Sequence, residues 1–78
     1  MAVVVIRVVD KATRKPVPFA PVQLGAYKSF TDGNGVATFD IAPGVYTIAI
    51  RHSDYRPYTA PMTIPPFEQY VYVERARM

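Results

Sequence analysis

The feature that most limits the fold of this chain is the regular spacing of its turn-forming residues. Six stretches rich in Gly, Pro, Asp and Asn mark reversals of the chain at 10–18, 24–26, 31–35, 42–44, 53–57 and 64–66. The intervals between them are short and rich in β-branched and aromatic residues. No stretch of a dozen residues shows a 3.6-residue apolar period free of Pro and Gly.

These intervals predict seven strands and no substantial helix. We expect the strands at 2–9, 19–24, 27–31, 36–41, 45–52, 58–64 and 67–75. Short strands at this spacing are typical of an all-β sandwich or barrel. The chain has no linker, internal repeat or low-complexity tract, so we expect a single domain over residues 1–78.

The composition excludes two common stabilisers of small domains. With no Cys and one His, the chain can form neither a disulfide nor a Cys/His zinc site. A chain this short has a thin core. We therefore expect it to rely on close packing, on eight prolines that restrict the unfolded chain, and on association with a partner. Six Arg against three Lys would also suit a thermostable protein.

The charge and the termini give only broad limits on partner and location. A net charge of +3 and a pI of about 9.5 mildly favour anionic partners. No run of 18 apolar residues could span a membrane, and the N-terminus does not read as a signal peptide. We expect a protein that is intracellular, belongs to a virion or similar assembly, or is extracellular after loss of a leader.

Period-two alternation assigns one side of each strand to the core. The inward side chains that it predicts are Ala2, Val4, Ile6, Val8, Ala37, Phe39, Ile41, Tyr46, Ile48, Ile50, Val71 and Val73. We expect Tyr46 and Tyr55 to be large core side chains whose hydroxyl groups reach partners at the rim.

Three strings, in order along the chain, carry a resemblance to a known family. They read VVDKATRKPVPFAPVQL, TDGNGVATF and IAPGVYTIAIRHSDYRPYT. Their order resembles the carboxypeptidase regulatory-like domains of the transthyretin-like (prealbumin-like) sandwich family. In that family a first strand ends in Asp and is followed by KP-hydrophobic-P, TD-x-x-G, PG-x-Y and a GY corner. The resemblance covers nearly the whole chain and implies a seven-stranded, Ig-like Greek-key sandwich.

Two turns and one corner are expected to need special backbone conformations. The Asp32–Gly35 stretch supplies residues that accept positive φ in a tight reversal, and we expect the same of Pro43 and Gly44. The corner departs from the family pattern because Asp54 stands where Gly before Tyr is usual. We expect Asp54 to tolerate the left-handed conformation there at some cost.

Enzymes and cross-linked domains of this architecture need residues that the chain lacks. Intradiol dioxygenases resemble the fold but bind iron through two His and two Tyr, whereas His52 is the single His. Hydroxyisourate hydrolases need several His and a C-terminal Tyr-Arg-Gly-Ser, whereas this chain ends Glu74-Arg75-Ala76-Arg77-Met78. In Cna B-type domains, a Lys of the first strand forms an isopeptide bond. The corresponding stretch of this chain offers Arg7 and no Lys, and a guanidinium stays protonated and is not that nucleophile. We therefore expect no enzyme, no catalytic residue and no cofactor.

His52 with Asp32 and Asp54 is the combination that a metal or acid–base site would use. A histidine at a strand end beside a loop is ordinarily solvated or hydrogen bonded. The aspartates lack the spacing of a calcium loop, and turn chemistry accounts for them. We expect no metal site.

Most cations are predicted to gather at one end of the sandwich, which we call the basic end. If the strands alternate in direction, the loops 10–18, 32–35 and 53–57 share that end with the C-terminus. The cations there are Lys11, Arg14, Lys15, Arg51, Arg56, Arg75 and Arg77. The carboxylates expected nearby are those of Asp10, Asp32, Asp54 and Glu74. This leaves either a neutralised, solvated loop end or a surface facing nucleic acid or an acidic protein.

The first strand is apolar on both sides, so its second side needs a cover. If the strands alternate in direction, strands 2–9 and 67–75 run the same way, and in sandwiches of the family that the chain resembles they are neighbours in one sheet. Their outward side chains would form one patch of Val3, Val5, Val9, Tyr70 and Tyr72, edged by Arg7, Glu68 and Glu74. Contiguous exposed apolar patches commonly mark protein–protein surfaces.

The sequence thus predicts a non-enzymatic structural module that docks through this patch. The partner would be another copy, including by exchange of the first strand, described as an apolar edge strand that invites pairing, or a larger assembly such as a filament, virion or multisubunit complex. Two alternatives stay open. One is a carbohydrate-binding module that uses Tyr27, Tyr55 and Tyr58; the other is a nucleic-acid accessory protein that uses the basic end.

Overall fold

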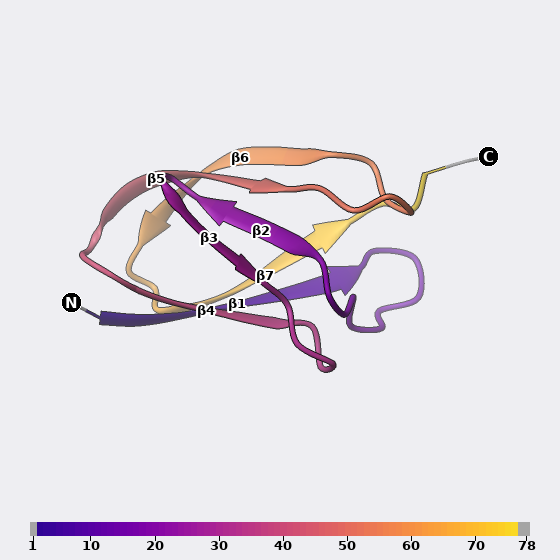
Figure 1. Ribbon diagram of the computed structural model, residues 1–78, viewed down its shortest axis with the longest axis horizontal. Helices are drawn as coiled ribbons and strands as arrows, with labels where there is room; N and C mark the ends of the chain where they lie inside the picture. Colours follow the sequence, from indigo (N-terminus) through magenta and orange to yellow (C-terminus); the bar gives the residue numbers. More distant parts are fainter. Residues whose placement is uncertain (1, 77–78) are drawn as a thin grey trace.

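Seven strands form two facing sheets (Figure 1), and the computed structural model describes residues 2–76. The strands are β1 (Ala2–Asp10), β2 (Pro21–Leu24), β3 (Tyr27–Phe30), β4 (Val36–Ile41), β5 (Gly44–Ile50), β6 (Tyr58–Ile64) and β7 (Glu68–Val73). These residues include no helix, hence none long and apolar enough to cross a membrane. The predicted all-β, seven-stranded sandwich is confirmed.

The strand order explains how β1 comes to have two apolar sides. One sheet has the order β4-β1-β7 and the other β3-β2-β5-β6. β1 pairs antiparallel with β4 and parallel with β7, so the predicted same-direction pairing of the first and last strands is confirmed. Sheet neighbours are mostly non-consecutive in the chain, as in Greek-key sandwiches. β1 is central, so the description of the first strand as an apolar edge strand is wrong.

The core lies between the sheets and consists largely of the side chains that alternation assigned to it. The side chains of Val4, Ile6, Val8, Ala37, Phe39, Ile41, Ile48, Ile50, Val71 and Val73 are all buried. Tyr46 and Tyr55 pack against this cluster from its rim. Their hydroxyl groups donate to the Ala42 carbonyl and to the Asp10 carboxylate, respectively, as predicted.

Strand direction gathers three loops and the end of β7 at one end of the sandwich, on the right in Figure 1. Backbone hydrogen bonds join them: the Val8 amide donates to Gly35 at 2.9 Å, and the Arg56 amide donates to Glu74 at 2.8 Å. The predicted convergence of these loops is therefore correct.

The backbone differs from expectation at two turns. Gly25 and Gly35 have positive φ, at 62° and 76°, but Gly44 does not and instead begins β5, so the prediction for Pro43 and Gly44 is wrong. Asp54 does not adopt the left-handed conformation either. Its amide donates to His52 Nδ1 at 3.0 Å, which closes the corner in ordinary backbone geometry.

The strand that was expected to begin at residue 19 begins at Pro21, because Phe19 has a φ of 57°. Thr31 holds Phe19 in this conformation. The Phe19 amide donates to the Thr31 carbonyl at 2.9 Å, and the Thr31 hydroxyl accepts from the Ala20 amide at 2.7 Å. A buried threonine thus fixes an aromatic residue in a conformation that bulky residues rarely adopt.

Candidate interaction surfaces

The outer side of the β4-β1-β7 sheet is the surface that the sequence singled out. We call it the valine–tyrosine face, made of Val3, Val5, Arg7 and Val9 of β1, Tyr70, Tyr72 and Glu68 of β7, and Val36, Thr38 and Asp40 of β4. Parallel register places Arg7 beside Tyr70 and Val9 beside Tyr72. Val3, Tyr70 and Tyr72 are 58%, 56% and 46% exposed. The structure therefore brings all six predicted interface residues to one face.

Arg7 lies in the middle of this face and not at its edge, so the prediction for its place is wrong. The reason is that β1 is the central strand. Arg7 Nε donates to Glu68 Oε2 at 2.6 Å, and its guanidinium lies 6.0 Å from the centre of the Tyr70 ring. Both partners of this ion pair are half exposed. The Arg7–Glu68 ion pair thus divides the apolar surface of this face.

Tyr72 links the valine–tyrosine face to the basic end. The Arg14 guanidinium lies 5.9 Å from the centre of its ring. Lys11 and Glu74, which flank the ring, form an ion pair with an N–O distance of 3.7 Å. The apolar face therefore ends against a charged rim on this side, as is common at protein interfaces.

The basic end holds six of the seven predicted cations: Lys11, Arg14, Lys15, Arg51, Arg56 and Arg75. Arg77 lies outside the described residues. Lys11 pairs with Glu74, and Arg75 lies 3.7 Å from Asp10. The other four form no ion pair with any residue between 2 and 76. The carboxylates that were expected to neutralise this end do so only in part.

Asp32 caps its own loop and forms no ion pair with the described residues. Its Oδ1 accepts from the Asn34 amide at 2.8 Å and from the Val36 amide at 3.1 Å. This is the turn chemistry that the sequence predicted for it.

Asp10 has a role that the sequence analysis missed. It is 2% exposed and accepts the Tyr55 hydroxyl at 2.8 Å, together with the Ala12 and Thr13 amides at 2.9 and 3.2 Å. The Tyr55 hydrogen bond holds the pKa of the Asp10 carboxyl below its usual value. Burial and this hydrogen bond raise the pKa of Tyr55.

Asp10 is therefore an anchor that joins the first strand to the corner. Arg75, which follows β7, also takes part in this anchor, because its Nη2 donates to the Tyr55 hydroxyl at 3.3 Å. A signal for this was present in the sequence: Asp10 lies two residues after the inward-facing Val8, so alternation already placed it on the core side.

The three residues considered for a metal or acid–base site serve separate local purposes. His52 accepts from the Asp54 amide and packs edge-on against Tyr55, with ring centres 5.3 Å apart. Asp32 closes its own turn. Within residues 2–76, no three His, Cys, Asp or Glu side chains are grouped so that they could hold a metal ion.

The tyrosines of the carbohydrate-binding alternative do not share one surface. Tyr27 begins β3, at the end of the sandwich opposite the corner that contains Tyr55 (Figure 1). Tyr55 and Tyr58 pack against the core. A site built from all three is therefore not formed.

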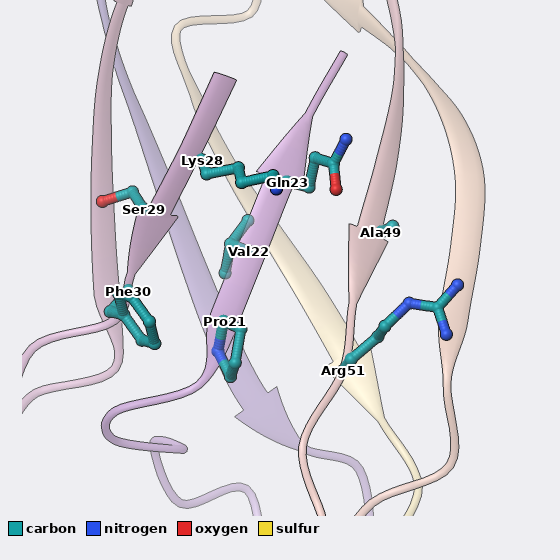
Figure 2. A pocket seen from close by; sticks show the side chains of 8 residues that line it. All are labelled: Pro21, Val22, Gln23, Lys28, Ser29, Phe30, Ala49 and Arg51. Carbon is teal, nitrogen blue, oxygen red and sulfur yellow. The ribbon is translucent and has the colours of Figure 1, made fainter. Parts of the chain in front are cut away.

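The second sheet carries a shallow groove that the sequence analysis did not identify. Figure 2 shows it over β2, between β3 and β5, lined by Pro21, Val22, Gln23, Lys28, Ser29, Phe30, Ala49 and Arg51. Its outward aromatic, Phe30, is 66% exposed. The only signal was that alternation places Phe30 on the same side of a short strand as Lys28.

Comparisons with known proteins agree with the fold. The chain is similar to a solved structure of the Caf1A usher C-terminal domain, a small β-sandwich, with a TM-score of 0.65 and 7% identity over 97% of this chain and 100% of that one. For that domain, conserved hydrophobic clusters on the surface are described as important for F1 antigen assembly. No family model and no curated protein sequence matches the chain. At this identity the likeness establishes the fold.

Proposed function

We propose that this protein is a non-enzymatic structural module that docks through its valine–tyrosine face onto copies of itself or onto a larger assembly, such as a filament, virion or multisubunit complex. The observation that carries the proposal is the exposure of Val3, Tyr70 and Tyr72 on adjacent strands of one sheet. In water this surface is unfavourable, and a partner would remove it.

The chemistry of the face suits an interface. Tyrosine and valine supply rigid apolar contact, and the Arg7–Glu68 pair supplies orientation through two charges that are already partnered with each other. At the edge of this sheet, Gln69 of β7 ties the two sheets together: its Nε2 donates to the Thr63 carbonyl at 2.8 Å and to the Pro66 carbonyl at 3.0 Å.

The structural neighbour supports this choice among functions. In the Caf1A usher C-terminal domain, surface hydrophobic clusters matter for assembly of another protein. A sandwich of the same shape with an exposed apolar face fits a similar role here.

We also infer that residues 1–78 form a single carboxypeptidase regulatory-like domain of the transthyretin-like family. Support comes from the parallel pairing of β1 with β7 and from the Tyr46 hydroxyl that closes the turn at Ala42. The enzymes of this architecture need residues that this chain lacks, so we propose no catalytic activity.

A second function is favoured by one observation at the basic end. Arg14, Lys15, Arg51 and Arg56 have no carboxylate partner among the described residues. Such cations would bind nucleic acid through phosphates, and retention would then fall steeply as salt rises. Measuring retention of the protein on DNA and RNA at 50 and 200 mM salt tests this.

The main proposal is tested by placing charge on the face. In Val3→Lys/Tyr70→Lys, both changes are at exposed positions and leave the core intact. The control Ala12→Lys/Ser53→Lys adds the same charge in exposed loops. We expect sedimentation at two concentrations to show an associating parent and control and a monomeric face variant. A face variant that assembles like the parent would refute the proposal, as would a parent that is monomeric and isolated without partners from its source.

A further inference from the structure

The outer side of the β3-β2-β5-β6 sheet carries cations but no carboxylate. None of its four strands contains Asp or Glu. We call this side the cationic face, made of Pro21, Gln23, Lys28, Phe30, Val45, Thr47, Ala49 and Arg51. Phe30 and Val45 are 66% and 72% exposed, so the face combines apolar surface with positive charge.

The groove described above lies in this face. Figure 2 shows Phe30 and Arg51 on opposite sides of Pro21, and the Lys28 side chain extending across toward Gln23. Neither Lys28 nor Arg51 forms an ion pair within residues 2–76. An occupant with a carboxylate beside apolar groups would complement both the charges and the apolar walls.

The valine–tyrosine face has this complementary chemistry. Asp40 is exposed, lies beside Val3 in the β1–β4 register and forms no ion pair with the described residues. Glu68 is half exposed despite its bond to Arg7. The two faces of one molecule therefore differ in sign: one has unpaired cations and the other an unpaired carboxylate, each among exposed apolar side chains.

We propose that the partner of the valine–tyrosine face is the cationic face of a second copy of this chain, with Asp40 directed toward the Lys28–Arg51 groove. Pairing two cationic faces would bring Lys28 and Arg51 against their own copies, which like-charge repulsion opposes. Pairing two valine–tyrosine faces would leave the groove uncovered. Front-to-back stacking satisfies both surfaces.

This arrangement has a consequence for assembly. A front-to-back contact is heterologous, so each added copy presents the same free face as the last, and stacking continues as an open chain unless the rotation closes a ring. The inference rests on the proposed function, because it uses the same valine–tyrosine face and adds the identity of its partner.

The test is complementation between two defective variants. The first is Val3→Lys/Tyr70→Lys, and the second is Lys28→Glu/Arg51→Glu, which leaves the first face intact. Lys15→Glu/Arg56→Glu is the matched control, since it reverses two other unpaired cations outside both faces. Native mass spectrometry and sedimentation give the mass of each protein and of the mixtures, and circular dichroism verifies folding. If a double variant does not fold, Tyr70→Lys or Lys28→Glu alone replaces it.

We expect the parent and the control to grow beyond dimers as concentration rises. Each face variant alone should stay at the 8.7 kDa monomer, and the equimolar mixture should form a one-to-one dimer of about twice that mass, because one intact face of each kind remains. A cationic-face variant that assembles like the parent, a mixture that stays monomeric, or a monomeric parent would overturn this inference. If Val3→Lys/Tyr70→Lys fails to assemble while the cationic-face variant assembles like the parent, the proposed function stands and the partner surface is a different one. If both variants assemble like the parent, the inference and the proposed function both fail.

Discussion

At the scale of single residues, polar groups inside the fold are paired, and Asp10 is the clearest case. A buried carboxylate is costly unless it is hydrogen bonded, and Asp10 accepts from one hydroxyl and two backbone amides. Alternation predicted the side of the strand on which it lies. The identity of its partner could not be predicted, because Tyr55 is 45 residues away and arrives through the packing of the corner.

This pairing predicts a pH dependence of stability. The pKa of Asp10 is lower in the folded chain than in the unfolded chain, mainly because of Tyr55. Its contribution is therefore complete above the unfolded pKa of about 3.9 and is lost as pH falls through the lower, folded pKa. We expect Tyr55→Phe to reduce the stability lost between pH 7 and pH 2, measured by urea unfolding.

Tyr58→Phe is the matched control for this change, since Tyr58 is also half buried and its hydroxyl makes no hydrogen bond with the described residues. Its acid profile should follow that of the parent. If Tyr55→Phe followed the parent as well, the Tyr55–Asp10 bond would not set the acid sensitivity.

At the scale of strands, the period of two accounts for most of what the sequence predicted correctly. Val4 and Ile6 are buried, and Val3 is exposed, because a strand in a two-layer sandwich has one inner side. The errors have a different origin. Arg7 was misplaced because the position of β1 within its sheet depends on β4, whose pairing involves residues far along the chain.

The fifth strand gives the sharpest test of this assignment. Ile48 is fully buried between the sheets, so Ile48→Ala removes apolar contact and leaves a cavity. We expect the free energy of unfolding to fall by about 2–5 kcal/mol, measured by urea denaturation. Thr47→Ala changes the exposed neighbour and should cost less than about 1 kcal/mol. Equal effects at the two positions would mean that the strand has no preferred inner side.

At the scale of the whole molecule, the sequence predicted the sandwich and two of its three candidate surfaces, the valine–tyrosine face and the basic end. The valine–tyrosine face was visible because five consecutive apolar residues leave one side of β1 without a core. The cationic face was not, since it combines isolated side chains of three strands, and only the strand order β3-β2-β5-β6 brings Lys28 near Arg51. Surfaces that cross several strands depend on topology, which local patterns do not contain.

The thermal unfolding of the protein depends both on its composition and on its self-association. The chain offers no Cys, and its described residues group no metal ligands, so we expect a single cooperative transition that EDTA leaves unchanged. Self-association binds folded chains only, so the melting temperature should rise with protein concentration. In Val3→Lys/Tyr70→Lys this dependence should vanish. Scanning calorimetry at two concentrations, with and without EDTA, measures both effects and also tests the thermostability expected from the composition. A large fall in melting temperature with EDTA would reveal a metal site, and a concentration dependence that survives in the variant would place the stabilising contact elsewhere.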